Sequence, residues 1–226
     1  MNIDIIKEKA LNNHIPIVMD DTLDIIKNIL VKEKPKRILE IGTATGYSSI
    51  CFAKILLDSC REETLCPPII IDTIELDEVR ATEAVENIKE MNLENTINVF
   101  IGNAVEILPT LKESYDIIFI DAAKGKYPIF LKEAIRLSHE GSIILADNIL
   151  YKGYVMSDYN KHKQRTAVTH LREYIKEVTE NKNLETEILE VGDGLAVSKV
   201  KEQSDEVALC SRRFEFANKM SKSQRQ

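Results

Sequence analysis

The chain has 226 residues, of which 44% are hydrophobic and 30% are charged. The length suits one globular domain of the size common among α/β proteins. The composition excludes collagen-like, low-complexity and wholly disordered chains. The formal net charge of −7 argues against a uniformly basic nucleic-acid-binding protein. No apolar stretch is long enough to cross a membrane, and the N-terminus lacks the apolar region of a secretory signal. We therefore expect a cytoplasmic protein without a membrane partner.

The first elements in chain order are two amphipathic segments at 3–12 and 22–31, which predict helices interrupted at Pro16. Short apolar runs then alternate with segments of helical period, which is typical of βαβ units. The runs predict strands at 37–41, 69–74, 97–101, 115–120, 141–146, 186–189 and 195–200. The segments between them predict helices at 48–57, 77–91, 104–112, 127–137 and 163–179.

Several predicted strands, such as YDIIFI and SIILA, are apolar almost throughout. Strands of parallel sheets have this composition because both of their faces are buried. Gly192 and Gly194 in VGDGL suggest a hairpin between the last two strands. The sequence thus predicts one α/β domain over residues 1–200, with the N-terminal helices in 1–33. Periodicity fades over 201–226, and we expect this C-terminal tail to be flexible.

The first predicted strand ends in ILEIGTATGYSS, where Gly42 and Gly46 indicate a sharp turn into a helix. Doubly wound sheets bind nucleotide-like ligands at such turns. The G-x-x-x-G spacing matches neither the dinucleotide fingerprint nor the P-loop. Glu75 ends the second strand, where an acid can accept both ribose hydroxyls of an adenosine group. Asn103 and Ala104 end the third strand, where an adenine edge would lie. The alternative is a tight turn beside a solvated acid.

The fourth predicted strand ends in Asp121, and the fifth ends in Asp147 and Asn148. Two carboxylates and an amide oxygen suit a hard cation such as Mg²⁺, and the set lacks the His and Cys ligands of zinc. Lys124 follows Asp121 by three residues. A partly desolvated lysine near a divalent cation loses proton affinity and can act as a general base, so Lys124 and Asp121 form the predicted catalytic pair. The alternatives are an ordinary turn at Asp147 and a solvated loop lysine.

Four motifs occur in this order: EIGTATGYS, IELD, FIDAAK and LADN. Together they resemble the cation-dependent O-methyltransferases, the family of the catechol and caffeoyl-CoA O-methyltransferases, over most of the chain. The resemblance implies S-adenosylmethionine as methyl donor and a class I methyltransferase fold, a Rossmann-like, seven-stranded, mostly parallel sheet with an antiparallel last strand. It also implies Lys124 as the base and Asp121, Asp147 and Asn148 as metal ligands. The donor contacts that it implies are Val18, Gly42, Ser48, Glu75, Ala104 and Asp121.

One departure from the resemblance concerns the acceptor side. The catechol enzymes place a Tyr near the sulfonium at the position of Ala44 and wall the substrate with Trp, whereas this chain has no Trp. A flat catechol slot of the animal type is therefore not expected. In the implied mechanism, Mg²⁺ binds two vicinal acceptor oxygens and lowers the pKa of the hydroxyl. Lys124 takes the proton, and the oxyanion attacks the sulfonium methyl group in line.

The segment after the fifth strand points to the acceptor. Residues 161–182 hold six Lys and Arg against three acids, in an otherwise acidic chain. Basic groups beside tyrosines suit a flipped nucleotide, although a solvated helix face is the alternative. The pattern K-H-K-x-R…L-R-E-Y resembles the bacterial tRNA 5-hydroxyuridine methyltransferases of this family, which implies conversion to 5-methoxyuridine at the wobble position. The predicted contacts to the tRNA anticodon stem-loop are Lys161, Lys163, Arg165 and Arg172.

Two further functions stay open from the sequence. One is a small-molecule catechol-type O-methyltransferase with the same catalytic residues. The other is a non-catalytic donor-binding or RNA-binding module, against which the complete metal set and Lys124 argue. The N-terminal amphipathic helices could pair two subunits, so we expect a homodimer.

Overall fold

The computed structural model describes residues 2–60, 67–157 and 164–201. The strands are β1 (Arg37–Ile41), β2 (Ile70–Glu75), β3 (Ile97–Ile101), β4 (Tyr115–Ile120), β5 (Ser138–Ala146), β6 (Leu184–Leu189) and β7 (Leu195–Val200). The α-helices are α1 (Ile3–Asn12), α2 (Asp20–Glu33), α3 (Tyr47–Ser59), α4 (Glu78–Glu90), α5 (Ala104–Ile107), α6 (Tyr127–Arg136) and α7 (Arg165–Glu180). Two short 3₁₀ helices complete the list, η1 (Leu108–Thr110) and η2 (Lys124–Lys126).

The strands form one seven-stranded sheet in the order β3-β2-β1-β4-β5-β7-β6. Strands β1 to β5 pair in parallel, whereas β7 is antiparallel to both of its neighbours, β5 and β6. This arrangement confirms the predicted α/β class with an antiparallel last strand. It also confirms the predicted hairpin between the last two strands.

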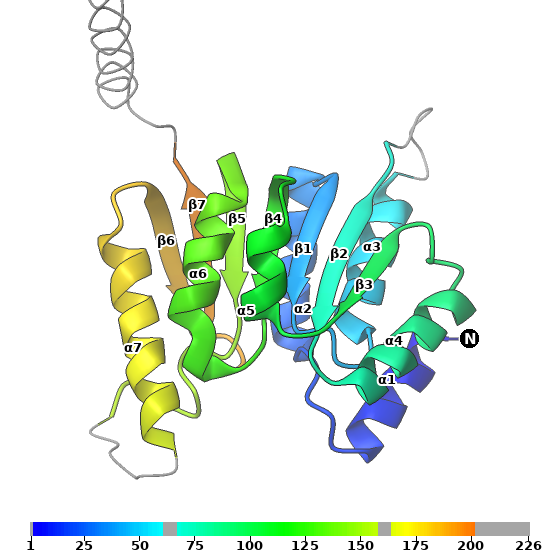
Figure 1. Ribbon diagram of the computed structural model, residues 1–226, viewed down its shortest axis with the longest axis horizontal. Helices are drawn as coiled ribbons and strands as arrows, with labels where there is room; N and C mark the ends of the chain where they lie inside the picture. The colour runs from blue at the N-terminus through cyan, green and yellow to red at the C-terminus, as the bar shows by residue number, and fades with distance from the viewer. Residues whose placement is uncertain (1, 61–66, 158–163, 202–226) are drawn as a thin grey trace, which may run out of the picture.

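Helices cover both faces of the sheet, as Figure 1 shows, with α5, α6 and α7 in front and α2 and α3 behind. Side chains alternate along the buried strands, so each strand supplies both cores. In β4, for example, Ile117 and Phe119 belong to the core beneath α1, α2 and α3, and Ile118 and Ile120 belong to the core beneath α6 and α7. Burial on both faces explains why the central strands are apolar almost throughout.

Two elements differ from their predicted bounds by more than two residues at one end. The helix predicted over 104–112 ends at Ile107 and continues as η1, because Pro109 lacks the N–H that a longer helix needs at that position. Strand β5 begins at Ser138, earlier than the predicted 141. Tyr115 of β4 pairs with Ser138 of β5, whereas Ile117 pairs with Ile143, so the polar residues around Gly141 form a bulge in β5. A bulge of this kind leaves no periodic pattern in the sequence.

No helix in the described part of the chain is long and apolar enough to cross a membrane. The predicted tail falls almost wholly on 202–226, which lie outside the described residues.

Candidate active site

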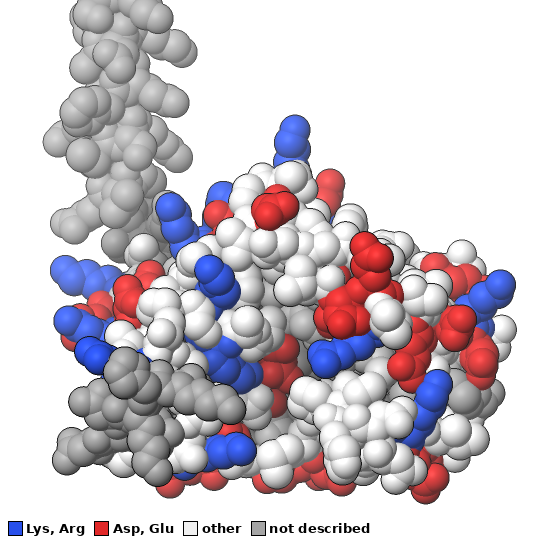
Figure 2. Space-filling model, turned by 60° about the horizontal axis from the view of Figure 1, so that its bottom comes forward, with Lys and Arg blue, Asp and Glu red and all other residues white. Residues whose placement is uncertain are grey.

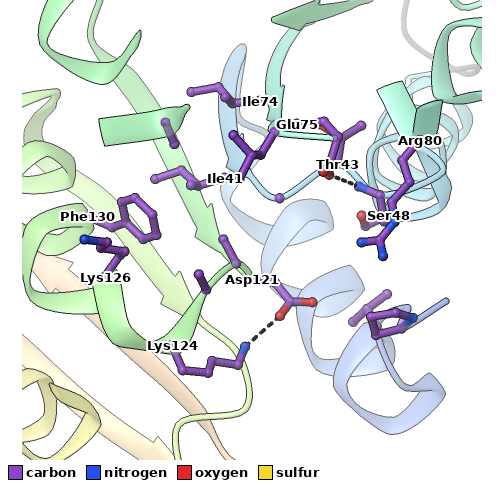
Figure 3. Close-up of a pocket in the computed structure, with 18 of the residues that line it drawn as sticks. Ile41, Thr43, Ser48, Ile74, Glu75, Arg80, Asp121, Lys124, Lys126 and Phe130 are labelled. Carbon is purple, nitrogen blue, oxygen red and sulfur yellow. Dashed lines mark hydrogen bonds and ion pairs between the residues drawn. The ribbon is translucent and has the colours of Figure 1, made fainter. Parts of the chain in front are cut away.

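A cavity of about 500 Å³ opens at the carboxyl edge of the parallel strands. Its walls come from the chain after β1, β2, β3, β4 and β5, together with the segment that joins α1 to α2. All of the residues expected at the methyl donor line this one cavity: Val18, Gly42, Ser48, Glu75, Asn103, Ala104 and Asp121. Lys124 and Asn148 line it as well. Figure 3 shows Glu75, Ser48 and Arg80 on one side of the cavity and Lys124, Lys126 and Phe130 on the other.

The turn after β1 depends on a glycine. Gly42 has φ of +110°, a conformation that L side chains rarely adopt, and its N–H donates to the carbonyl of Ile74. A Cβ at this position would lie 2.1 Å from the carbonyl oxygen of Asp121. The missing side chain therefore lets the turn after β1 pack directly against the end of β4, beside the cavity.

Glu75 ends β2 as a buried side chain held by two backbone amides. Its Oε2 accepts from the N–H of Ala44 at 2.7 Å, and its Oε1 accepts from the N–H of Asp77 at 2.9 Å. Each carboxylate oxygen has a second lone pair, so the fixed group keeps acceptor capacity for hydroxyls of a ligand. Asn103 caps α5, since its Oδ1 accepts from the N–H of Val105 at 3.1 Å.

A buried acid beneath the turn was missed from the sequence. Glu40, the fourth of the five residues of β1, accepts from Ser48 Oγ at 2.5 Å and from Thr73 Oγ1 at 2.6 Å. The hydroxyl of Thr73 lies 2.6 Å from that of Thr43, which lines the cavity. Burial raises the pKa of Glu40 to about 7, and its hydrogen bonds oppose the shift. The only sign in the sequence is one acid inside the apolar run RILEI.

The predicted metal ligands meet at the ends of β4 and β5, with Lys124 between them. Lys124 Nζ donates to Asp121 Oδ1 at 2.9 Å and to Asn148 Oδ1 at 3.0 Å. Asp147 lies behind them and is 1% exposed. Its Oδ1 accepts from the N–H of Asn148 at 2.7 Å, whereas its Oδ2 is buried with no hydrogen-bond partner among the described residues. Burial, followed by the nearby charge of Asp121, raises the pKa of Asp147 to about 7.

These residues fit a hard divalent cation. A buried carboxylate oxygen without a partner is costly, and a cation would compensate that cost. Two carboxylates and one amide oxygen match the ligands that Mg²⁺ prefers. Within the described ranges, no three or more His, Cys, Asp or Glu side chains gather closely enough to hold a metal. Such a site would therefore need Asn148, which adopts a φ of +55° that Asn tolerates better than most residues.

A tyrosine beside Lys124 was also missed. Tyr127 begins α6, is completely buried, and has its hydroxyl 2.7 Å from Lys124 Nζ. In the sequence it is one of seven tyrosines, with no motif to mark it.

Two of the four predicted tRNA contacts, Arg165 and Arg172, lie on α7. Lys161 and Lys163 fall outside the described residues, and Arg165 is exposed on the first turn of the helix. Arg172 contacts the loop that follows β5, since its Nε donates to the Val155 carbonyl at 3.0 Å and its Nη2 donates to the Tyr154 carbonyl at 3.3 Å. Arg172, which the sequence analysis predicts as a tRNA contact, therefore connects the loop after β5 to α7.

The order of the strands and the cavity at their carboxyl edge define a Rossmann-like methyltransferase architecture. The model of the O-methyltransferase family matches residues 6–201. The chain belongs to this family. A catechol O-methyltransferase of Niastella koreensis is 34% identical over 175 residues, which cover 74% of each chain.

Two solved structures extend the comparison. A Staphylococcus aureus protein, provisionally assigned as a caffeoyl-CoA O-methyltransferase, is 33% identical with a TM-score of 0.79, over 88% of this chain and 92% of its own. The O-methyltransferase of Bacillus cereus, solved with S-adenosylhomocysteine (SAH), is 26% identical with a TM-score of 0.76, over 88% of this chain and 90% of its own.

Proposed function

We propose that the chain is an S-adenosylmethionine-dependent, Mg²⁺-dependent O-methyltransferase that converts 5-hydroxyuridine to 5-methoxyuridine at the wobble position of tRNA. The observation that carries the proposal is the Lys124 ammonium between Asp121 and Asn148, on the wall of the cavity that holds every expected donor residue. A methyl donor and a deprotonated acceptor would meet at that wall.

The donor end of the cavity suits an adenosyl group with a positive charge. Glu75 offers two fixed acceptor oxygens to a ribose diol, and Asn103 and Ala104 line the cavity beyond it. Asp121 faces the cavity and offers a negative charge toward the sulfonium. The donor itself supplies an activated methyl group when it is bound.

The catalytic end suits removal of a proton from a hydroxyl. A cation held by Asp121, Asp147 and Asn148 would supply positive charge that lowers the pKa of an acceptor hydroxyl. Lys124 lies within hydrogen-bond distance of two of these residues. A neighbouring divalent charge would favour the neutral amine of this lysine, and that amine is placed to take the proton as general base. Lys124 is largely withdrawn from solvent, with 15% of its side chain exposed, which favours direct transfer over exchange with bulk water.

Basic side chains near the cavity support a polynucleotide acceptor. Lys126, Lys152 and Arg165 are exposed, and Lys126 also lines the cavity. Figure 2 shows several blue side chains on the part of this face nearest α7, with red ones among them, and both colours on the opposite part. Basic side chains beside the cavity would contact and orient the tRNA phosphates. The 5-hydroxyl and O4 of the uracil ring are vicinal oxygens, like those of a catechol.

A small-molecule catechol-type O-methyltransferase is the second candidate. The relative from Niastella koreensis is named a catechol O-methyltransferase, which favours this alternative. This second candidate uses the same catalytic residues as the proposed enzyme and differs from it only in the acceptor.

The deciding experiment incubates 5-hydroxyuridine-containing tRNA with the protein, S-adenosylmethionine and Mg²⁺, with and without EDTA. Mass spectrometry of the nucleosides should show 5-methoxyuridine, and EDTA should abolish it. A parallel reaction contains a free catechol instead. Methylated catechol without modified tRNA would replace the proposed acceptor by the second candidate. No product from either acceptor would refute both.

The RNA contacts need a separate test with matched charge. Replacing Lys161, Lys163 and Arg165 by Ala should weaken tRNA binding at least tenfold at low salt and flatten its salt dependence, while donor binding stays unchanged. The control replaces three exposed lysines of α2 and α4, Lys27, Lys32 and Lys89, and removes the same charge elsewhere. Equal losses in the two variants would show a general effect of net charge and no local contact.

A further inference from the structure

The hydroxyl of Tyr127 connects three elements behind the cavity. It lies 2.7 Å from Lys124 Nζ of η2, 2.7 Å from the carbonyl oxygen of Asp147 at the end of β5, and 3.3 Å from the carbonyl oxygen of Ile120 at the end of β4. The side chain of Tyr127 has no exposed surface. No water can therefore replace these hydrogen bonds without a change in the packing around the ring.

The directions of these hydrogen bonds follow from the groups. A lysine ammonium only donates, so the Tyr127 oxygen accepts from Lys124. A phenol has one proton, which leaves it free to donate to a carbonyl oxygen, and the Asp147 carbonyl is the nearer of the two. Tyr127 thus links Lys124 to the backbone of a candidate metal ligand.

Four acceptor atoms lie within reach of the three protons of the Lys124 ammonium, and they are not equivalent. Two of them, Asp121 Oδ1 and Asn148 Oδ1, are side-chain oxygens that a cation would use. The Asp147 carbonyl is more distant, at 3.3 Å. The hydroxyl of Tyr127 is the shortest contact of the four, and it comes from a residue outside the predicted metal set.

We propose that Tyr127 is a positioning residue, which keeps Lys124 Nζ at the cavity wall when the oxygens of Asp121 and Asn148 bind a cation. The same hydroxyl fixes the peptide carbonyl of Asp147 and so restrains the start of the loop that carries Asn148. The inference rests on the proposed role of Lys124 as base and is independent of whether the acceptor is tRNA or a catechol.

The chain offers a matched control in Tyr174 of α7. Its ring packs edge-on against that of Tyr127, with centroids 5.5 Å apart, and it is also completely buried. Its hydroxyl has no hydrogen-bond partner among the described residues. Replacing either Tyr by Phe removes one buried oxygen from the same aromatic pair, but only the Tyr127 oxygen contacts Lys124.

The experiment compares Tyr127→Phe, Tyr174→Phe and the unmodified chain with whichever acceptor the unmodified chain methylates. Tyr127→Phe should lower kcat about tenfold, as expected for loss of one hydrogen bond to a charged group, with KM for the donor within twofold. Tyr174→Phe should leave both constants within twofold. Hydrogen–deuterium exchange without metal or substrate gives a second measurement, in which Tyr127→Phe alone should speed exchange in the peptide that covers 121–127.

The two measurements separate the possible failures. If Tyr127→Phe retains kcat within twofold, or if Tyr174→Phe lowers kcat equally, Tyr127 does not position Lys124. If the unmodified chain methylates neither acceptor, the proposed function fails, and exchange over 121–127 still tests the hydrogen bonds of Tyr127. Unchanged exchange in Tyr127→Phe would then overturn the inference. Thermal midpoints and donor binding by calorimetry establish that both variants are folded.

Discussion

The contact between Gly42 and Asp121 shows how one residue type decides the shape of the cavity. The α-carbon of Gly42 faces the carbonyl of Asp121 so closely that no side chain fits between them. Asp121 is expected to contact both the donor and the metal, so a shift of its backbone would disturb both sites. The positive φ of Gly42 adds a second requirement for glycine.

Gly42→Ala should therefore reduce both stability and donor binding. We expect a loss of about 3 kcal/mol or more in the free energy of unfolding, from strain and the steric clash together, and at least tenfold weaker donor binding. Urea unfolding and calorimetry measure the two effects. The control is Gly141→Ala, at a φ of +85° with no atom within 4 Å of the added Cβ, which should cost only about 1 kcal/mol. Similar losses in the two variants would rule out the clash as the cause.

Hydrogen bonds from two separate parts of the chain hold the loop after β5 in place. The N–H groups of Ile149 and Leu150 donate to the carbonyls of Gly194 and Asp193 in the turn between β6 and β7. From the other side, Arg172 of α7 donates to carbonyls of the loop, including that of Val155. Because Asn148 begins this loop, its position depends on two segments distant in sequence.

Arg172→Ala should loosen the loop and lower stability by about 1–2 kcal/mol, since hydrogen bonds from a charged donor are lost. Hydrogen–deuterium exchange should quicken in the peptide that covers 149–157, and thermal unfolding should begin at a lower temperature. Arg165→Ala is the comparison, because Arg165 lies on the same helix and has no side-chain hydrogen bond among the described residues. Were Arg165→Ala to quicken loop exchange as much, the contacts of Arg172 would not be the cause.

At the scale of the whole molecule, the two edges of the sheet differ. The cavity lies at the carboxyl edge. At the opposite edge, Asp116 of β4 connects the two neighbouring strands, β1 and β5. Asp116 accepts from the N–H groups of Lys36 and Arg37 at the start of β1 and contacts His139 Nε2 of β5 at 3.0 Å. The pKa of His139 is raised, first by the hydrogen bond between the His139 ring and the Glu140 carbonyl and then by the contact with Asp116, and some desolvation opposes the shift.

This contact predicts a pH dependence of stability. The folded-state pKa of His139 is above its unfolded value, so its contribution is fully present below about pH 6.5 and is lost as pH rises through the folded pKa. The histidine side chain is 47% exposed, so screening keeps the effect below about 1 kcal/mol. Urea unfolding at pH 5.5 and 8.5 should show a larger difference between the unmodified chain and His139→Gln at the lower pH. A difference independent of pH would contradict the assignment.

The homodimer stays a prediction at the same scale. Helices α1 and α2 expose Ile5, Leu11 and Val31, between 44% and 54% of each side chain. Apolar side chains in this number are compatible with a subunit contact, which light scattering on the purified chain measures.

The sequence by itself determined the class of fold and the residues around the cavity. Apolar runs of period two and helical segments are local patterns, so they were readable without the structure. Parallel strands end at one edge, so Glu75, Asn103, Asp121 and Asp147 could be placed together from their positions at strand ends. The family resemblance added Val18 and Ser48, and the structure brings both to the same cavity.

Only the tertiary structure decided how these residues are held. Glu40 and Thr73 are 33 residues apart in the sequence, and Tyr127 and Asp147 are 20 apart, yet each pair is joined by a hydrogen bond. Neither pair produces a periodic pattern in the sequence. Arg172 reads from sequence as a free basic residue, yet packing turns it toward the loop after β5. Local patterns report which face of an element is buried, whereas hydrogen bonds between buried groups depend on how the elements pack.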